Sequence, residues 1–518
     1  MSELPEGWQA STVGECFLEI KNGTTATQNK LASGITVSRI ETIQNNKFDL
    51  NRVQHIESPS HELVEAYKYQ EGDIAFSHIN SFEHVGKTAL YEGKPETLIH
   101  GMNLLRLRRG HEYIYPKFAH YFMLSNFFRD EVRKRVGHAV NQVSINQKNL
   151  SEVPFVLAPL DEQRRIVAKL EKLLSRVDGA QARLATIPRI LKRFRQSVLA
   201  AACSGRLTAD WREQLVERSC DPIDLQRLDE ERRTIIAKIY EQKDAKRFTC
   251  KPSVKIDIGN KSKGIDELFE LPSSWQWVSL GQVTWDVADG PHFSPKYVDK
   301  HSGVPFISGR NISYNGIDFS DAKYVSRGDH AEFIKRAKPM RRDVLLTKGG
   351  TTGIATIVDT DEAFSIWVHV ALLKVIEKFV SPYYLRDVLS SSFVYKQSQE
   401  QTHGVGNQDL GLTRMVYMAL PLPPLAEQQE IVRRVEALFK TADALEARYR
   451  TAKAHVDKLT QSILAKAFRG EFVPQDPNDE PASVLIERLN QSALHSNYKR
   501  SRTTSCEAKV EATARRKN

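Results

Sequence analysis

The residues of this sequence that could take part in chemistry do not complete a known catalytic pattern. The tripeptide GKT at 86–88 ends like a nucleotide-binding loop, but Ser81 stands where a phosphate-binding glycine would be needed. The dipeptide HE at 61–62 lacks the second histidine that would place two zinc ligands on one helix face. The GVG at 404–406 is a lone GxG, which a plain turn explains. These patterns give no support for catalysis with nucleotides, zinc or dinucleotides.

Two acidic residues, Asp73 and Asp343, fall at equivalent places in the two halves of the chain. Neither is accompanied by the second acid and lysine that a nuclease centre would need, and a turn aspartate explains both. The [DN]PP[YF] tetrapeptide of amino-methyltransferases is also missing, since Leu422 precedes the two prolines at 423–424. We therefore expect binding or assembly rather than catalysis, with no metal or cofactor held by this chain.

The composition is that of a globular protein with several domains. At about 100–200 residues per domain, 518 residues make three or four domains. The most apolar stretch, 364–376, contains His369 and Lys374 and is shorter than the roughly 18–20 residues of a membrane helix. The first residues, MSELPEGW, lack the layout of a signal peptide, and the five cysteines form no CxxC pair. We therefore expect a cytoplasmic protein with reduced thiols.

The formal charge of +10 favours a nucleic-acid partner only weakly, because half of it lies at one end of the chain. Residues 495–518 hold seven basic and two acidic side chains. We expect this tail to be solvated and disordered.

The sequence contains an internal duplication. LPEGWQ at 4–9 matches LPSSWQ at 271–276, and PLDEQRRIV at 159–167 matches PLAEQQEIV at 424–432. The two offsets, 267 and 265, are nearly equal over some 200 residues, which chance does not produce. The chain is therefore two copies of one unit.

Each copy has a mixed segment followed by a helix. Short β-rich runs bounded by Gly, Asn and Pro predict α+β globular domains at 1–158 and 269–423. Apolar residues then recur in steps of four and three, which predicts long helices at 159–205 and 424–470. Glycines end both stripes, and Pro188 should kink the first helix or lift one turn out of it.

The predicted apolar stripes are narrow and need a partner. They consist of Ile166, Leu170, Leu173, Val177, Ala180, Leu184, Ile187, Leu191, Phe194, Val198 and Ala201, and of Ile431, Val435, Leu438, Ala442, Leu445, Tyr449, Ala452, Val456, Leu459 and Ile463. Each helix could pack on its own globular domain, but their matched lengths favour pairing with each other. The polar linker 206–268 and the second domain leave room for an antiparallel pair, with 471–518 as the tail. We predict an α+β protein with two similar domains, two antiparallel coiled-coil helices and pseudo-twofold symmetry.

The duplicated unit resembles the specificity (S) subunit of Type I restriction-modification systems. The resemblance is carried by LPEGW and LPSSW, by PLDEQ and PLAEQ, and by QSVLAAACSGRL and QSILAKAFRGEF at the helix ends. It implies two target recognition domains that each read one half of a split sequence in double-stranded DNA. It also implies docking to two methyltransferase (modification) subunits and, through them, to motor-nuclease (restriction) subunits. S-adenosylmethionine, ATP and magnesium would belong to those partners.

On this resemblance, the loops after the second strand pattern of each copy are the best candidates for base reading, because their side chains carry donors and acceptors. The candidates in these loops are Ser77, His78, Asn80, His84 and Lys87 in the first copy, and Thr347, Lys348, Thr351 and Thr352 in the second. Further candidates are Arg39 and Arg310, near the preceding strand of each copy, and two amide-rich loops next to a histidine, with Asn141 and Gln142 in the first copy and Asn407 and Gln408 in the second. A solvated loop residue or a phosphate contact remains the alternative for each of them.

Glu162 and Gln163, like Glu427 and Gln428, lie in the first turn of a predicted long helix. Capping of that helix and contact with a partner subunit are both open roles for them. For the chain as a whole, the alternatives to a specificity subunit are a free-standing bipartite DNA-binding protein and an enzyme with an unrecognised site.

Overall fold

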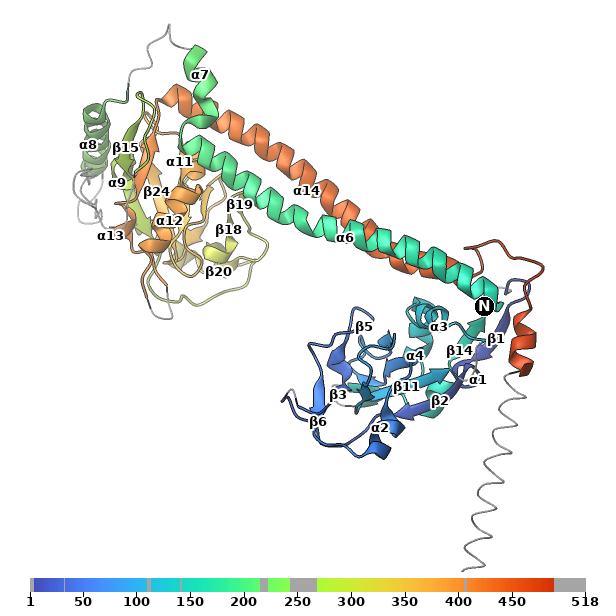
Figure 1. Cartoon of the computed structure of the whole chain (residues 1–518). Coiled ribbons are helices and arrows are strands. Elements are labelled where there is room, and N and C mark those ends of the chain that lie inside the picture. The colour runs from blue at the N-terminus through green and yellow to red at the C-terminus, as the bar shows by residue number, and fades with distance from the viewer. Residues whose placement is uncertain are drawn as a thin grey trace, which may run out of the picture. The chain divides into compact units, whose positions relative to one another are not determined.

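The computed structural model describes residues 4–31, 33–109, 113–139, 142–214, 222–242, 268–404 and 408–488. The chain divides into two compact units: unit 1 comprises residues 1–185 and 451–518, and unit 2 comprises residues 186–450. Figure 1 shows a mixed set of strands and helices in each unit, together with the long helices α6 and α14. None of the helices in the described ranges is both long and apolar enough to cross a lipid bilayer.

Unit 1 is built on a four-stranded antiparallel sheet in the order β2-β11-β7-β9. These strands are β2 (Phe17–Asn22), β11 (Leu104–Arg109), β7 (Ile74–Ser77) and β9 (Thr88–Leu90). Two three-stranded sheets accompany it: β10 (Ile99–His100), β3 (Ile35–Ser38) and β6 (Gln54–Ile56), and β12 (Gly137–Ala139), β13 (Gln142–Ser144) and β8 (Ile79–Asn80). Strand β1 (Gln9–Thr12) pairs antiparallel with β14 (Pro154–Leu157), which joins the two ends of the domain next to α6.

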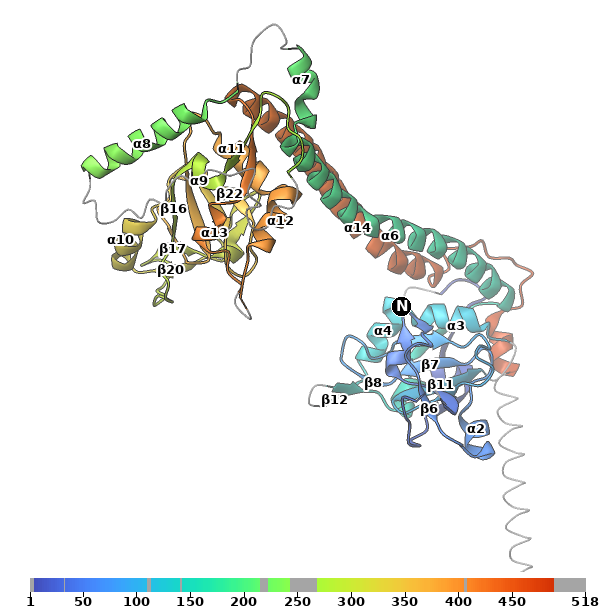
Figure 2. The same ribbon diagram turned by 60° about the vertical axis from the view of Figure 1, so that its left-hand side comes forward.

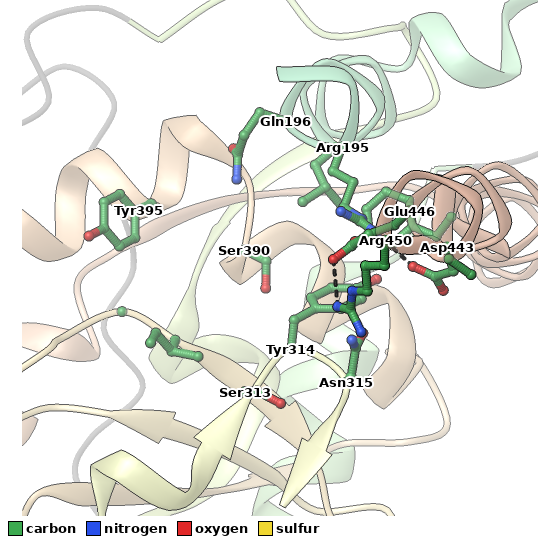
Figure 3. A pocket seen from close by; sticks show the side chains of 15 residues that line it. Arg195, Gln196, Ser313, Tyr314, Asn315, Ser390, Tyr395, Asp443, Glu446 and Arg450 are labelled. Atoms are coloured by element: carbon green, nitrogen blue, oxygen red, sulfur yellow. Dashed lines mark hydrogen bonds and ion pairs between the residues drawn. The ribbon is translucent and has the colours of Figure 1, made fainter. Parts of the chain in front are cut away.

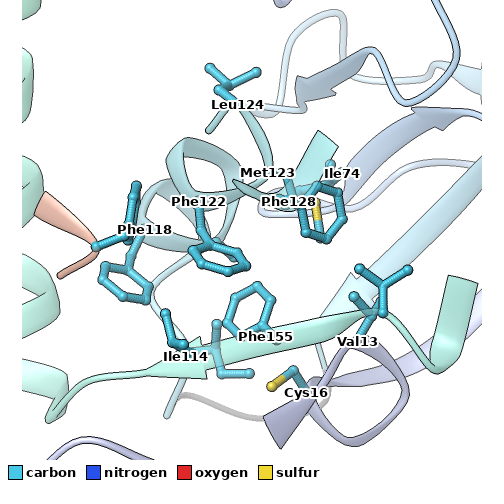
Figure 4. Packing of buried hydrophobic residues seen from close by; sticks show 14 of the residues in the cluster. Val13, Cys16, Ile74, Ile114, Phe118, Phe122, Met123, Leu124, Phe128 and Phe155 are labelled. Atoms are coloured by element: carbon cyan, nitrogen blue, oxygen red, sulfur yellow. The ribbon is translucent and has the colours of Figure 1, made fainter. Parts of the chain in front are cut away.

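Short helices and a hairpin complete the first domain. They are α1 (Val13–Cys16), η1 (Ile40–Thr42), β4 (Ile43–Gln44), β5 (Lys47–Phe48), α2 (His61–Tyr67), α3 (Pro116–Met123), α4 (Asn126–Arg133) and α5 (Gln147–Ser151). The core between α3, α4 and the strands is aromatic: the rings of Phe122 and Phe155 lie 4.6 Å apart, with Phe118 and Phe128 beside them (Figure 4). Cys16, in this core, and Cys203, in unit 2, are buried free thiols.

Unit 2 repeats this topology, except that its described residues form no sheet equivalent to β12-β13-β8. Its main sheet has the order β16-β24-β21-β22, formed by β16 (Thr284–Asp289), β24 (Val370–Val375), β21 (Val344–Thr347) and β22 (Ala355–Ile357). The remaining strands are β15 (Gln276–Ser279) with β25 (Ala419–Leu422), the set β20 (Lys323–Val325), β17 (Val304–Ile307) and β23 (Ser365–Ile366), and the hairpin β18 (Ile312–Ser313) and β19 (Gly316–Ile317). Its short helices are α9 (Leu280–Val283), η4 (Gly309–Asn311), α10 (Arg327–Arg336), α11 (Pro382–Leu389), α12 (Ser392–Glu400) and α13 (Leu412–Met415). The duplication predicted from sequence is therefore a duplication of fold.

The two predicted long helices are confirmed as α6 (Leu160–Cys203) and α14 (Leu425–Ala467). In unit 1, the beginning of α6 packs with the end of α14, since Ile166 and Leu170 share a core with Leu464. In unit 2 the end of α6 packs with the beginning of α14, since Val198 shares a core with Val435. The pairing is antiparallel within each unit, as predicted, and Figures 1 and 2 both show the helices side by side.

The predicted stripe differs from the observed contact in detail. Leu445 is 48% exposed and Leu459 42%, whereas Glu446 forms the contact to Arg195 of α6, at 2.9 Å. Phe194 is also exposed. A strict seven-residue repeat drifts by about 20° per heptad relative to a straight α-helix, so a stripe drawn over many heptads leaves the true interface.

Three other predictions can be compared with these elements. Pro188 lies inside α6, and no turn of the helix is lifted out there. The segment predicted as a polar linker contributes η2 (Arg206–Thr208), α7 (Ala209–Gln214) and α8 (Leu225–Gln242), and Leu228 of α8 joins the core of unit 2. Most of the predicted tail, 489–518, lies outside the described residues.

The glycines predicted to end the helices have a clear structural reason. Gly205 and Gly470 both have φ of 74°, the left-handed region that side chains with a Cβ disfavour. A Cβ on Gly205 would also lie 2.6 Å from Cγ of Pro272, and one on Gly470 would lie 2.1 Å from Cγ of Pro5. Each helix end therefore fits closely against the LP dipeptide that opens a copy.

Candidate nucleic-acid interface

The start of α6 is tied into unit 1 by two buried side chains. Trp8 Nε1 donates to Oε2 of Glu162 at 3.0 Å. Gln163 Oε1 accepts from the backbone N–H of Tyr115 at 2.9 Å, and its Nε2 donates to the carbonyl oxygen of Ala158 at 2.8 Å. Tyr115 is the N-cap residue of α3, so Gln163 binds the start of one helix to the start of another.

Unit 2 repeats this arrangement. Trp275 Nε1 donates to Oε2 of Glu427 at 2.8 Å. Gln428 Oε1 accepts from the backbone N–H of Ser381, the N-cap residue of α11, at 2.8 Å. We call each tryptophan, glutamate and glutamine set a helix-start lock: Trp8, Glu162 and Gln163 in unit 1, and Trp275, Glu427 and Gln428 in unit 2.

These acidic and amide side chains form the helix-start locks and have neither of the two predicted roles, helix capping or contact with a partner subunit. Glu162, Gln163, Glu427 and Gln428 are each at most 1% exposed, which leaves them no surface for a partner subunit. Their hydrogen bonds run to a tryptophan and to the N-cap residue of a neighbouring helix, so they do not cap their own helix. Local spacing could not reveal this, because the tryptophan partners lie 154 and 152 residues away.

The two locks differ in the neighbours of the carboxylate. Glu427 also accepts from Thr208 Oγ1 at 2.7 Å and pairs with Arg212. Oε1 of Glu162 has no hydrogen-bond partner among the described residues, and burial raises the pKa of this carboxyl.

Four of the residues predicted to read bases are buried instead. Ser77 and Thr347 end strands β7 and β21, which lie inside the main sheets, and both are fully buried. Lys348 is 3% exposed and bonds Asp409 at 2.8 Å. Thr352 is 2% exposed and accepts from Gln399 at 3.1 Å. The prediction was wrong for Ser77 and Thr347 because their strands are paired on both sides in the middle of a sheet. It was wrong for Lys348 and Thr352 because their side chains are buried against Asp409 and Gln399 of the same domain.

The remaining candidates differ in exposure. His84, Gln142, Arg310, Thr351 and Gln408 are exposed, and Arg39, His78, Asn80 and Lys87 are half-buried. Asn141 and Asn407 lie outside the described residues. Arg39 is held by Gln54 at 2.9 Å, and Arg310 by the carbonyl oxygen of Asp321 at 3.0 Å, so each is anchored within its own subdomain.

The structure brings the two kinds of candidate loop together in both units. In unit 1, β8 pairs with β13, which places Asn80 on the same small sheet as Gln142, and the carbonyl oxygen of His78, directly before β8, accepts from the backbone N–H of Ile145 at 3.0 Å. In unit 2, the backbone N–H of Gly350 donates to the carbonyl oxygen of Gln408 at 3.2 Å. In each unit these two loops thus form one polar surface, which we call the reading surface after the role predicted for it: His78, Asn80 and Gln142 in unit 1, and Thr351 and Gln408 in unit 2.

Sequence reasoning missed a charged network behind the reading surface of unit 2. Asp289 is 2% exposed and lies 3.4 Å from Lys348 Nζ, and it also pairs with Arg336. His292 lies 3.3 Å from the same carboxylate. These residues come from three separate segments, 289–292, 336 and 348, so no local spacing in the sequence could have indicated the whole network.

Unit 2 also has a cavity of about 630 Å³ next to its helix pair. The hairpin residue Tyr314 lies on one side, and Arg195 and Glu446 from the two helices lie on another (Figure 3). Tyr314 donates to Asp387 at 2.6 Å and packs on Phe439 of α14, with ring centroids 5.2 Å apart. These contacts fasten the domain of unit 2 to its part of α14.

Two similar α+β domains, each locked to the start of a long helix and each carrying polar loops, define a two-part recognition protein. The sequence matches the family of the Type I restriction modification DNA specificity domain over residues 5–189 and 272–453. The chain therefore belongs to this family, with two specificity domains, as the resemblance indicated. It is the DNA-recognition part of such a system and not its catalyst.

Individual relatives agree with this assignment. The chain is 29% identical to the putative type I restriction enzyme MjaX specificity subunit of Methanocaldococcus jannaschii, covering 91% of this chain and 95% of that protein. It is 30% identical to the EcoBI specificity subunit of Escherichia coli (69% and 68% covered) and 28% identical to the StySPI specificity subunit of Salmonella potsdam (96% and 98% covered).

Two solved structures share the fold. A chain from a type I restriction-modification system superposes with a TM-score of 0.58 at 19% identity, covering 91% of this chain and all of that one. The HsdS subunit from Thermoanaerobacter tengcongensis gives 0.51 at 20% identity, with 90% and 98% covered.

Proposed function

We propose that this chain reads a split sequence in double-stranded DNA, with one half read by each unit, and docks two methyltransferase subunits. Through them it would join the motor-nuclease subunits of a complete restriction complex. The observation that carries the proposal is that the two units share a fold but have different reading surfaces. The sheet order and the helix-start locks recur in both units, whereas the exposed loop residues do not.

The reading surfaces support different half-sites. Unit 1 presents His78, Asn80 and Gln142, whereas unit 2 presents Thr351 and Gln408. An amide side chain suits adenine and a hydroxyl is less selective, so unlike loops on one frame favour unlike base preferences. Phosphate contacts would add affinity without sequence information.

Exposed apolar side chains on the helices support the docking role. In unit 2, Ile190 is 57% exposed, and Phe194 and Leu445 are exposed as well. Large solvent-exposed apolar side chains on a paired helix are typical of a surface that a protein partner covers. S-adenosylmethionine, ATP and magnesium would then be bound by the partners, and this chain would bind none of them.

Co-purification tests the proposal. The full chain, expressed with the neighbouring genes of its host, should bring down a methyltransferase, and the complex should transfer labelled methyl groups from S-adenosylmethionine to DNA. Methyl transfer by this chain alone would overturn the subunit role. A chain that binds DNA tightly but never retains a methyltransferase would favour a free-standing DNA-binding protein.

A further inference from the structure

Unit 1 carries a cluster of basic side chains beside its reading surface. Lys87 follows the loop 81–86, and Arg129 and Arg133 lie one turn apart on α4. Loop and helix are in contact, since a Cβ on Gly86 would lie 3.5 Å from Cγ1 of Val132. We call Lys87, Arg129 and Arg133 the basic cluster.

The basic cluster is poorly neutralised. Arg133 lies 3.1 Å from Asp130, but Lys87 and Arg129 have no carboxylate partner among the described residues. Within the described part of the chain, Arg129 Nη2 donates to Asn46 Oδ1 alone, at 3.2 Å. The Nε atoms of Arg129 and Arg133 are buried without a hydrogen-bond partner in the described structure. Among the described residues, Lys87 Nζ and Arg129 Nη1 also form no hydrogen bond, and both side chains are only half-buried, so these donors are left over for an acceptor that comes from outside the chain.

The positive charges of the basic cluster also repel one another. The pKa of Lys87 is lowered by partial burial and by the charge of Arg129, and that of Arg129 by burial and by Arg133. Like charges held together at a half-buried site cost free energy unless an anion binds there.

The duplication provides an internal comparison. The backbone N–H of Ser77 donates to the carbonyl oxygen of Lys87, as that of Thr347 does to Ile354, so Lys87 and Ile354 are equivalent. The N-cap serines Ser125 and Ser391 likewise align α4 with α12. The counterparts of Arg129 and Arg133 are then Tyr395 and Gln399.

None of the three counterparts in unit 2 carries a charge. Gln399 of α12 instead donates to the carbonyl oxygen of Thr352 at 3.1 Å, so a hydrogen bond within unit 2 holds the loop to the helix. The same loop and helix therefore form without cations, and the fold does not require the charges of the basic cluster.

We propose that the basic cluster holds a backbone phosphate of the DNA next to the half-site read by unit 1, and that unit 2 lacks this contact at the equivalent place. The inference rests on the proposed function, because the anion is taken to be DNA. Guanidinium groups match phosphate oxygens with two parallel donors. The ring centroid of Phe82 lies 5.8 Å from the Arg133 guanidinium, a contact that helps to hold this side chain in place.

The test uses the full chain and a mixed-sequence duplex of 40 base pairs, because a phosphate contact does not depend on sequence. Arg129→Gln and Lys87→Gln should each weaken binding about tenfold at low salt and lower the slope of log K against log salt by about one. Lys134→Gln, an exposed lysine on the same helix end that already pairs with Glu131 at 2.6 Å, is the matched control and should change neither quantity. Tyr395→Gln in unit 2 should also leave the slope unchanged.

Folding is checked by thermal denaturation, where both variants should melt at or above the wild-type temperature because repulsion is relieved. Unchanged affinity and slope in both folded variants would overturn the inference and leave the proposed function intact. So would an altered base preference at one half-site with an unchanged slope, since this would make the cluster a base reader. A wild-type chain that binds no DNA at low salt would overturn the proposed function itself.

Discussion

The indole of Trp8 and the carboxylate of Glu162 are joined by a buried hydrogen bond of 3.0 Å, and Trp275 and Glu427 repeat it at 2.8 Å. These bonds connect the residue directly before the first strand of each domain with the helix that follows the domain. They explain why LPxxW and PLxEQ occur as a pair in both copies. Each domain is thereby fixed to its helix, which a reader with a defined orientation requires.

The two helix-start locks should respond differently to loss of charge. Glu427→Gln removes the ion pair to Arg212 and should destabilise unit 2 by about 2 kcal/mol, because a charged hydrogen bond contributes about 1.5–3 kcal/mol. Urea unfolding followed by tryptophan fluorescence measures this, since five of the six tryptophans belong to unit 2. An unchanged midpoint would show that the lock does not support the unit.

Glu162→Gln should behave in the opposite way. Burial raises the pKa of Glu162, so the stability that this residue contributes is complete below its unfolded pKa and is lost as pH rises through the folded one. At pH 7 the neutral glutamine should therefore leave unit 1 as stable as before or more stable, with the bond from Trp8 retained. Proteolysis of unit 1 at pH 4.5 and pH 7 measures it, and clear destabilisation at pH 7 would contradict the account.

Asp387 should give unit 2 a measurable pH dependence. Burial raises the pKa of Asp387 to about 6, against the ordinary 3.8. Its contribution to stability is thus complete below pH 4 and lost as pH rises through 6, by about 2–3 kcal/mol. The difference between wild type and Asp387→Asn in urea unfolding should follow this course, and a difference independent of pH would rule it out.

Truncations along the long helices should separate buried from exposed leucines. Leu170 is fully buried, and Leu170→Ala should cost about 2–5 kcal/mol. Leu445 is 48% exposed, and Leu445→Ala should cost less than about 0.5 kcal/mol and weaken methyltransferase binding instead. Thermal unfolding and co-purification check the two effects, and equal destabilisation by both would contradict the observed helix contact.

The parts of the structure predicted from sequence are those that depend on repeated local patterns. The duplication could be predicted because the same short motifs occur twice in the sequence. The two helices and their terminal glycines could be predicted because apolar spacing and a helix-ending glycine such as Gly205 are signals that extend over only a few residues. The locks were not, because Gln163 and Tyr115 are 48 residues apart and meet only in the folded domain.

The reading surface could be predicted only in part for a related reason. His78 and Gln142 were selected for their donors and acceptors, and pairing of β8 with β13 brings them together. Ser77 and Thr347 were selected on the same ground, but their strands lie inside sheets assembled from distant segments. Burial of such positions depends on sheet order, which no local pattern specifies.

The central claim, two independent readers on one frame, is tested most directly by exchanging residues 1–158 for the corresponding domain of a relative and sequencing the methylated bases of the host genome. The account predicts that one half of the methylated sequence changes while the other half and the gap between them stay the same. A change in both halves, or methylation at unchanged sites, would contradict it.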